Sequence, residues 1–298
     1  MNAFFALTKR NTKLFFKDKG MFFTSLITPL ILLVLYATFL ARVYRESFTS
    51  ALPEFMTIPD KLINGCVGGE LFSSLLAVSC ITVAFCSNMI MVQDKVSGAR
   101  TDLTITPVKR STLALSYYCS TVLVTLIVCL VATGVCFLYL ANVGWYLSAA
   151  DVLSILLDVL LLVLFGTALS SIINFFLSSQ GQISAVGTII SAGYGFLCGA
   201  YMPISSFGEG LRKVLSFLPG TYGTALIRNH ALNGVFAEMG TQGFPKEVVE
   251  GIRDSIDCNL YFYGDLVSTG AMYAILAGSV AVLIGVYVLL NLVHRNGK

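Results

Sequence analysis

Residues 194–228 read YGFLCGAYMPISSFGEGLRKVLSFLPGTYGTALIR, and this stretch decides the fold. An apolar segment with little charge ends at Pro203. An amphipathic segment follows, and a second proline turn stands at Leu218-Pro219 before the stretch closes on Arg228. Proline ends helices because it lacks an N–H donor and its ring clashes with the preceding turn. A soluble core has no use for a membrane-length segment that stops at a proline and returns along an interface. The stretch therefore predicts a membrane-spanning helix followed by external re-entrant helices.

The composition indicates a chain that is solvated mostly by lipid. Of its 298 residues, 56% are hydrophobic and 12% are charged, whereas soluble domains carry about 25% charged residues. The net charge is only +3, and the basic residues form short clusters near the ends of apolar segments. Such clusters are typical of membrane orientation rather than of nucleic-acid binding. We therefore expect an all-α integral membrane protein without a nucleic-acid partner.

Six apolar segments predict six transmembrane helices. The preceding residues, 1–20, alternate apolar and basic positions and predict an interfacial helix in the cytoplasmic headgroup layer, or else a basic flank that only orients the first span. Five basic residues before the first span place the N-terminus in the cytoplasm, and the basic tail 294–298 places the C-terminus on the same side. The six-span domain is 21–298, with spans at 21–41, 70–92, 113–141, 152–177, 183–202 and 270–293.

The connections alternate between the two sides of the membrane. Cys66 and Cys258 fall in external connections and can form a disulfide. Two free thiols are favoured, because nothing in the sequence shows that the two residues lie close together. The external connections are 42–69, 142–151 and the region 203–269, which contains a predicted helix at 245–257. The cytoplasmic ones are 93–111 and 178–182.

Polar residues within the spans are candidate functional residues. Asp158 lies about two turns from the start of its span, so we expect its carboxylate to reach the external headgroups rather than to act inside the membrane. The hydroxyl-rich second span and the Gly- and Ser-rich fifth span either mediate close helix packing or line a substrate path. The path candidates are Ser73, Ser79, Thr82 and Phe85 in the second span and Ser184, Thr188 and Ser191 in the fifth.

Two motifs stand out from the hydropathy pattern. The first is Asp94-Lys95, Gly98, Leu103, Thr106-Pro107-Val108 and Arg110; the second is Phe196-Leu197-Cys198-Gly199, Pro203, Leu218-Pro219, Tyr222 and Arg228. Both resemble motifs of type-2 ABC exporter permeases, and the order and spacing of the six spans extend the resemblance over essentially the whole chain. In the first motif the family usually has Thr, Leu and an acidic residue after the glycine, where this chain has Ala99, Arg100 and Thr101. More distantly, the chain is similar to ABCG half-transporters.

The resemblance implies a multi-pass permease subunit in a bacterial cell membrane. Loop 93–111 would form a coupling helix that docks on a separate ATPase subunit, present in two copies, which binds ATP and magnesium; the chain itself would bind no cofactor and no metal. With a second permease subunit, identical or similar, it would export a drug, lipid or peptide by alternating access. The implied coupling residues are Asp94, Lys95, Gly98, Leu103, Thr106, Pro107 and Arg110, and the implied external gate residues are Gly199, Pro203, Pro219, Tyr222 and Arg228.

Three other functions are weighed against this one. A polysaccharide or teichoic-acid permease would show an aromatic belt in its path, but the second and fifth spans contain few aromatic residues. An intramembrane lipid-modifying enzyme needs converging polar or metal-binding residues, and apart from Asp158 and Asn174 the spans offer none. An ion-coupled carrier would show internal repeats and midplane charges. The sequence also lacks a G-x-x-x-x-G-K-[ST] phosphate loop, so we do not expect the chain to hydrolyse ATP itself.

Overall fold

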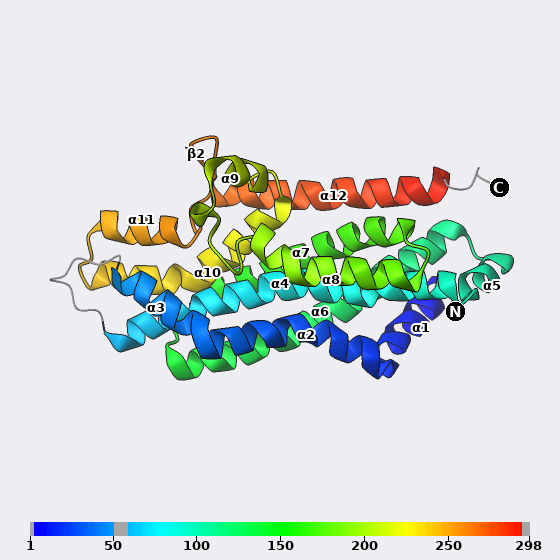
Figure 1. Ribbon diagram of the computed structural model, residues 1–298, viewed down its shortest axis with the longest axis horizontal. Helices are drawn as coiled ribbons and strands as arrows, with labels where there is room; N and C mark the ends of the chain where they lie inside the picture. Colours follow the sequence, from blue (N-terminus) through cyan, green and yellow to red (C-terminus); the bar gives the residue numbers. More distant parts are fainter. Residues whose placement is uncertain (1–2, 51–58, 294–298) are drawn as a thin grey trace.

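The computed structural model describes residues 3–50 and 59–293, which form an elongated bundle of helices (Figure 1). Pro53 of the first external connection and the basic tail 294–298 lie outside the described residues. In chain order the elements are α1 (Ala3–Lys17), α2 (Lys19–Leu35), the π-helical η1 (Tyr36–Leu40), α3 (Ala41–Ser50), α4 (Asp60–Val96), α5 (Ala99–Ile105), α6 (Arg110–Val143), α7 (Ala149–Phe176), α8 (Gln180–Leu197), the 3-10 turn η2 (Ile204–Ser206), α9 (Glu209–Leu215), α10 (Pro219–Thr241), α11 (Lys246–Ser255), β1 (Tyr261–Phe262), β2 (Asp265–Leu266) and α12 (Thr269–Val293).

Helix α4 is the central helix of the bundle. Its 37 residues extend about 55 Å, and it packs against α2, α6, α7, α8 and α10. The predicted start of this span at residue 70 is wrong, because the glycine-rich segment 65–69 continues the helix instead of ending a loop. A Cβ atom on Gly69 would lie 2.5 Å from Cδ2 of Leu232. Close packing against α10 therefore explains why glycine is used there despite its poor helix propensity.

Five helical segments of the described chain are long and apolar enough to cross a membrane: α2 with its continuation to Glu46, α4, α6, α7 and α12. They correspond to the first, second, third, fourth and sixth predicted spans. Helix α8 lies where the fifth span was predicted, but it ends at Leu197 and does not meet the same criterion. Many apolar side chains of α2, α6 and α12 are exposed on the outside of the bundle, as a lipid environment requires.

The two ends of the bundle differ in their elements. Helix α5 lies at one end of the long axis and α11 lies near the other (Figure 1). We call these the α5 end and the α11 end. Helix α1 and the last turn of α12 both lie at the α5 end, so the described chain starts and finishes on the same side.

The segment after Pro203 is more regular than the sequence predicted. It forms η2 and α9, and Pro219 then stands in the first turn of α10, where its missing N–H is not needed. Helix α10 was not predicted, since its apolar and small residues are distributed around the helix rather than along one face. It is buried against α4, α7 and α12. The predicted helix 245–257 is present as α11, followed by the short antiparallel hairpin β1–β2.

The elements at the α11 end share a separate hydrophobic cluster. Tyr44 of α3, Phe236 of α10 and Ile252 of α11 belong to it, together with Cys66 and Cys258. Both cysteines are free and buried, as the sequence favoured, although Cys66 lies within α4 and not in a loop. The cluster joins α3, α4, α10 and α11 into one packed unit beyond the central part of the bundle.

Candidate functional site

At the α5 end, Asp94 in the last turns of α4 joins three helices. Arg10 of α1 donates to both carboxylate oxygens, from Nη1 to Oδ2 at 2.6 Å and from Nη2 to Oδ1 at 2.9 Å. Tyr117 of α6 donates its hydroxyl to Oδ2 at 2.5 Å. The hydrogen bonds from Arg10 raise the pKa of its guanidinium above the ordinary value. Bidentate arginine–carboxylate pairs are stronger and more directional than single contacts, so Asp94 fixes α1 against α4 and α6.

Lys95, the next residue, holds the end of α7. Its Nζ donates to the backbone carbonyl oxygens of Asn174 at 3.1 Å, Phe175 at 2.6 Å and Leu177 at 3.1 Å. The last carbonyl groups of a helix lack partners within the helix, and a cation there also interacts favourably with the helix dipole. The adjacent residues 94 and 95 thus connect α4 to α1 and α6 on one side and to α7 on the other.

We expect D94N to weaken the attachment of α1. The amide keeps the shape of the carboxylate but loses the charge that both guanidinium contacts use, which should cost about 1–3 kcal/mol because hydrogen bonds to charged groups contribute that much. Thermal melting of the purified protein and limited trypsin cleavage at Lys9 and Lys13 measure the change. D102N, which alters an exposed carboxylate on α5, is the matched control. Equal cleavage of α1 in D94N and D102N would contradict the role of Asp94.

The loop 93–111, where a coupling helix was predicted, contains the short helix α5. Gly98 precedes it with φ of 83°, a left-handed conformation that glycine adopts without strain. At its other end Thr106 is extended and donates its hydroxyl to the carbonyl of Leu103 at 2.6 Å, and the chain bends at Thr106-Pro107. No residue of α5 is buried, and the side chain of Ile105 is 79% exposed. Helix α5 therefore presents an apolar side chain to the surroundings at the tip of the bundle.

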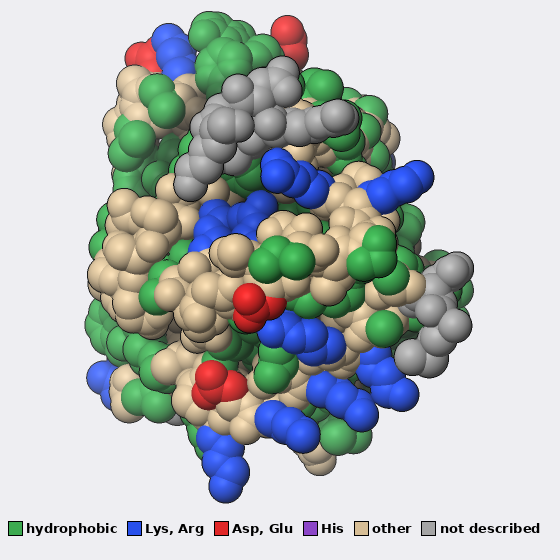
Figure 2. Space-filling view, turned by 90° about the vertical axis from the view of Figure 1, so that its right-hand side faces the viewer, with side chains coloured by type: hydrophobic (Ala, Val, Ile, Leu, Met, Phe, Trp, Pro, Cys, Tyr) green, Lys and Arg blue, Asp and Glu red, His purple; other side chains and the backbone are tan. Residues whose placement is uncertain are grey.

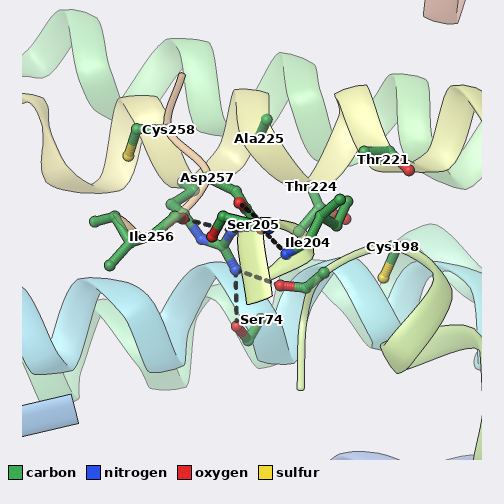
Figure 3. Close-up of polar contacts among 12 residues, drawn as sticks. Ser74, Cys198, Ile204, Ser205, Thr221, Thr224, Ala225, Ile256, Asp257 and Cys258 are labelled. Carbon is green, nitrogen blue, oxygen red and sulfur yellow. Dashed lines mark hydrogen bonds and ion pairs between the residues drawn. The ribbon is translucent and has the colours of Figure 1, made fainter. Parts of the chain in front are cut away.

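At the α11 end, the fully buried Arg228 of α10 contacts several elements. Figure 3 shows its neighbours Ser74, Ile256 and Asp257. Its Nη1 donates to the carbonyl of Ile256 at 2.7 Å, and its Nη2 donates to the carbonyl of Gly199 at 2.8 Å. Nη2 also lies 2.9 Å from Oε1 of Glu70 in α4. The carboxylate of Asp257 lies 3.9 Å from Nη1. A buried charge requires this degree of pairing, so Arg228 is the structural centre of the α11 end.

Asp257 extends the same cluster to η2. Its carboxylate accepts hydrogen bonds from the backbone N–H groups of Ile204 and Ser205, the second at 3.2 Å, and Figure 3 shows it beside these two residues. Burial raises the pKa of Asp257, while Arg228 and the backbone donors act in the opposite direction. Gly199, with φ of 74°, allows the chain to turn here, and a Cβ on it would lie 3.1 Å from the Asp257 carboxylate.

The other gate candidates lie along the same link between α8 and α10. Pro203 precedes η2 and Pro219 begins α10. Tyr222 donates its hydroxyl to the carbonyl of Ser216 at 2.6 Å and so fastens the end of α9 to α10. Beside them is a cavity of roughly 550 Å³, lined in part by Tyr222 and Asp257. Sequence reasoning selected Arg228 but missed its acidic partners, although a lone carboxylate at Glu70 beside an apolar span was a usable signal.

The structure separates the two sets of path candidates. Those on α4 are buried, and their hydroxyls donate to carbonyls of their own helix: Ser73 to Glu70, Ser79 to Leu75 and Thr82 to Val78; the Phe85 side chain is buried as well. Those on α8 (Ser184, Thr188 and Ser191) are exposed or half-buried. The α4 candidates are therefore buried within the bundle whereas the α8 candidates are not, and the two sets do not share one surface in this structure.

Asp158 does not reach the headgroups, so that prediction is wrong. It is fully buried, because it faces the interior of the bundle where two other helices supply donors. Its Oδ2 lies 2.6 Å from Nδ1 of His230 in α10, and its Oδ1 accepts a hydrogen bond from Tyr273 of α12 at 2.6 Å. Burial alone would lower the pKa of His230, but the hydrogen bond and charge of Asp158 outweigh it, so the pKa is raised. This cluster joins α7, α10 and α12.

Comparison with known proteins gives one finding. Residues 2–231 match the family model described as ABC-2 type transporter. The match runs from α1 into α10 and so includes α5 and Arg228. No curated protein and no solved structure matches the chain.

Proposed function

Because the chain belongs to the ABC-2 type transporter family, we propose that it is the membrane-spanning permease subunit of an ATP-driven exporter in a bacterial cell membrane. A separate ATPase subunit, in two copies, would bind ATP and magnesium, because this sequence has no phosphate-binding loop. A second permease subunit would complete the dimer. Alternating access of that dimer, in which helices shift as rigid bodies, would carry the substrate outward.

Helix α5 is the observation that carries this proposal. It is short, exposed and fixed at both ends, between Gly98 and the Thr106-Pro107 turn. The helices that it joins, α4 and α6, are themselves tied to α1 through Asp94 and to α7 through Lys95. A displacement of α5 would therefore reach four helices together, as coupling to an ATPase requires. Figure 2, which views the α5 end, shows many Lys and Arg side chains and few acidic ones, and such a surface favours the cytoplasmic side.

We further propose that α8 is the fifth of six crossings. Helix α7 ends and α8 begins at the α5 end, so the chain has to return toward the other end before α12 begins. The 18 residues of α8 extend about 27 Å, close to the 30 Å of a hydrocarbon core. Its exposed face carries Ile189, which is 67% exposed, as well as Ser184 and Thr188. A mixed surface of this kind suits a hydrophobic or amphiphilic substrate at the dimer interface.

The Arg228 cluster would act as the external gate in this scheme. It joins the end of α8 to α4, α10 and η2, so a movement of α8 relative to α4 has to break or shift its contacts. The buried α4 candidates would reach the path only when such a movement separates these helices. Liposomes that contain the permease and its ATPase subunit test the class directly: we expect export that depends on ATP hydrolysis and on both subunits.

The coupling role of α5 is tested by I105D. A charged carboxylate in place of an exposed apolar side chain should leave the fold intact but weaken ATPase binding about tenfold, since burial of an isoleucine side chain at an interface contributes roughly 1.5–3 kcal/mol. Pull-down titration of the two purified subunits measures it. Y263D is the matched control, because Tyr263 is a similarly exposed apolar residue on the hairpin near α9. Unchanged ATPase affinity in I105D would remove α5 from the proposed interface.

A further inference from the structure

A second cavity lies at the α5 end, beside the contacts that Lys95 and Tyr117 make there. It has a volume of roughly 570 Å³ and opens among the ends of α4, α5, α6, α7 and α12. Three of its lining residues are basic, namely Lys95, Arg100 and Arg110, and none of its lining residues is acidic. Figure 2 shows Lys and Arg side chains within a hollow of this face.

In the part of the chain that the structure describes, no carboxylate neutralises the positive charges of this cavity. The Nζ of Lys95 contacts backbone carbonyl groups and lies over the ring of Phe175, and neither Arg100 nor Arg110 has a carboxylate at ion-pair distance. Asp94, adjacent to Lys95, is already engaged by Arg10. Arg100 is half-buried and close enough to Lys95 to repel it. Like charges gathered in this way have an unfavourable energy that a bound anion would relieve.

The rest of the lining is suited to a phosphate group with an apolar attachment. The hydroxyl of Thr101 can donate to a phosphate oxygen, whereas the hydroxyls of Thr104 and Tyr287, which also line the cavity, donate to the carbonyl groups of Thr101 and Ala114. The lining also has apolar members, which include Leu113 and Phe176, whose side chain is largely exposed. A free inorganic anion would not use this apolar wall, whereas the glycerol and first acyl carbons of a phospholipid would.

We propose that this cavity binds a phosphate group, and specifically the headgroup of an anionic phospholipid in the leaflet at the α5 end. Arg100 and Arg110 contact the phosphate, and Lys95 contributes its charge from the end of α4. The apolar wall with Leu113 and Phe176 contacts the start of an acyl chain. The site holds an anionic lipid at the point where α5 joins the bundle. It depends on these residues alone and not on the exporter assignment.

Binding of phosphatidylglycerol to the purified full-length chain in detergent tests this site, with phosphatidylcholine as the comparison lipid. We expect phosphatidylglycerol to bind at least tenfold more tightly, since the choline cation of the other lipid would lie among three positive charges. The double variant R100Q/R110Q should weaken phosphatidylglycerol binding about twentyfold, because each basic residue near an anionic headgroup contributes roughly a fivefold factor. K109Q, which removes an exposed charge outside the lining, should change it less than twofold.

The other outcomes of this titration are equally informative. The double variant R100K/R110K keeps both charges and should retain most of the affinity, which separates loss of binding from loss of folding. Glycerol 1-phosphate identifies the source of the phosphate: competition at low millimolar concentration would support a phosphate site but overturn the lipid as its ligand. Equal binding of the two lipids, or an equal loss in K109Q and R100Q/R110Q, would overturn the site. Phosphatidylglycerol binding only when the ATPase subunit is present would overturn it as well.

Discussion

R228M is expected to lower the free energy of unfolding by about 3–5 kcal/mol, because removal of one partner from a buried ion pair leaves the other charge uncompensated. Methionine has a similar length, so the change removes the charge and the hydrogen bonds with little loss of packing. Glu70 would then be buried without its only ion-pair partner in the described chain, and the carbonyl groups of Gly199 and Ile256 would each lose a donor. We expect the α11 end to unfold before the rest of the bundle in this variant.

Thiol labelling during thermal melting in detergent measures this loss of stability. Cys66 and Cys258 are free and buried in the cluster at the α11 end, so a thiol-reactive dye reports when that region opens. The double variant R228M/E70Q removes the uncompensated charge and should recover part of the stability. R212Q, which removes an exposed arginine of α9, should leave the transition unchanged. If R228M and R212Q have the same melting temperature, the buried ion pair contributes little to the stability of the fold.

The helical architecture was predictable because hydropathy is a local signal. A span needs about 20 predominantly apolar residues, and the segment of α2 with its continuation to Glu46, α6, α7 and α12 each supply such a stretch. Helix α5 was predictable from the motif of residues 94–110 and its glycine and proline boundaries. The beginning of α4 was not, because glycine at 65–69 indicates a loop when read alone. Glycine is favourable there because other side chains approach the helix closely: Tyr146 at Gly65, Leu140 of α6 at Gly68 and Leu232 of α10 at Gly69.

The partners in the buried ion pairs could not be predicted from the sequence, for a different reason. Arg228 stood out as an arginine in an apolar stretch, and Asp158 as a carboxylate in a span, but their partners lie far away in the chain. Glu70 contacts Arg228 across the packing of α4 on α10, and Tyr273 contacts Asp158 across that of α7 on α12. Composition and spacing do not specify which faces of two helices meet. The expectation that Asp158 reaches the headgroups failed for this reason.

The cluster around Asp158 leads to the second large effect: H230L should lower the free energy of unfolding by about 3 kcal/mol at pH 6. This is the low end of the range for a broken buried ion pair, because the side chain of His230 is 17% exposed whereas that of Asp158 is fully buried. Leucine leaves Asp158 with Tyr273 as its remaining donor. Y273F, which removes only that hydroxyl, should cost less, about 1–3 kcal/mol.

The pH dependence distinguishes a charged pair from simple packing. The pKa of His230 is raised above its ordinary value of 6.5, so the stabilisation from its protonated form is fully present below pH 6.5 and is lost as the pH rises through the raised pKa. The wild-type melting temperature should therefore fall between pH 6 and pH 9. H230Q keeps a donor for Asp158 but cannot titrate, so its melting temperature should fall less over this pH range. The melting temperature of Y273F should fall as much as that of the wild type.

Charged and polar neighbours on each packed helix support this direction. Asp158 and Asp151 of α7 both act on His230 and both favour its protonated form, while Tyr273 faces it from α12. On α10 itself, Asn233 donates to Asp151 at 2.8 Å and fixes that carboxylate. Both carboxylates of α7 favour the imidazolium form of His230, so its protonated form strengthens the attachment of α7 to α10. An equal pH response in wild type and H230Q would place the titrating group elsewhere and leave His230 as a packing residue.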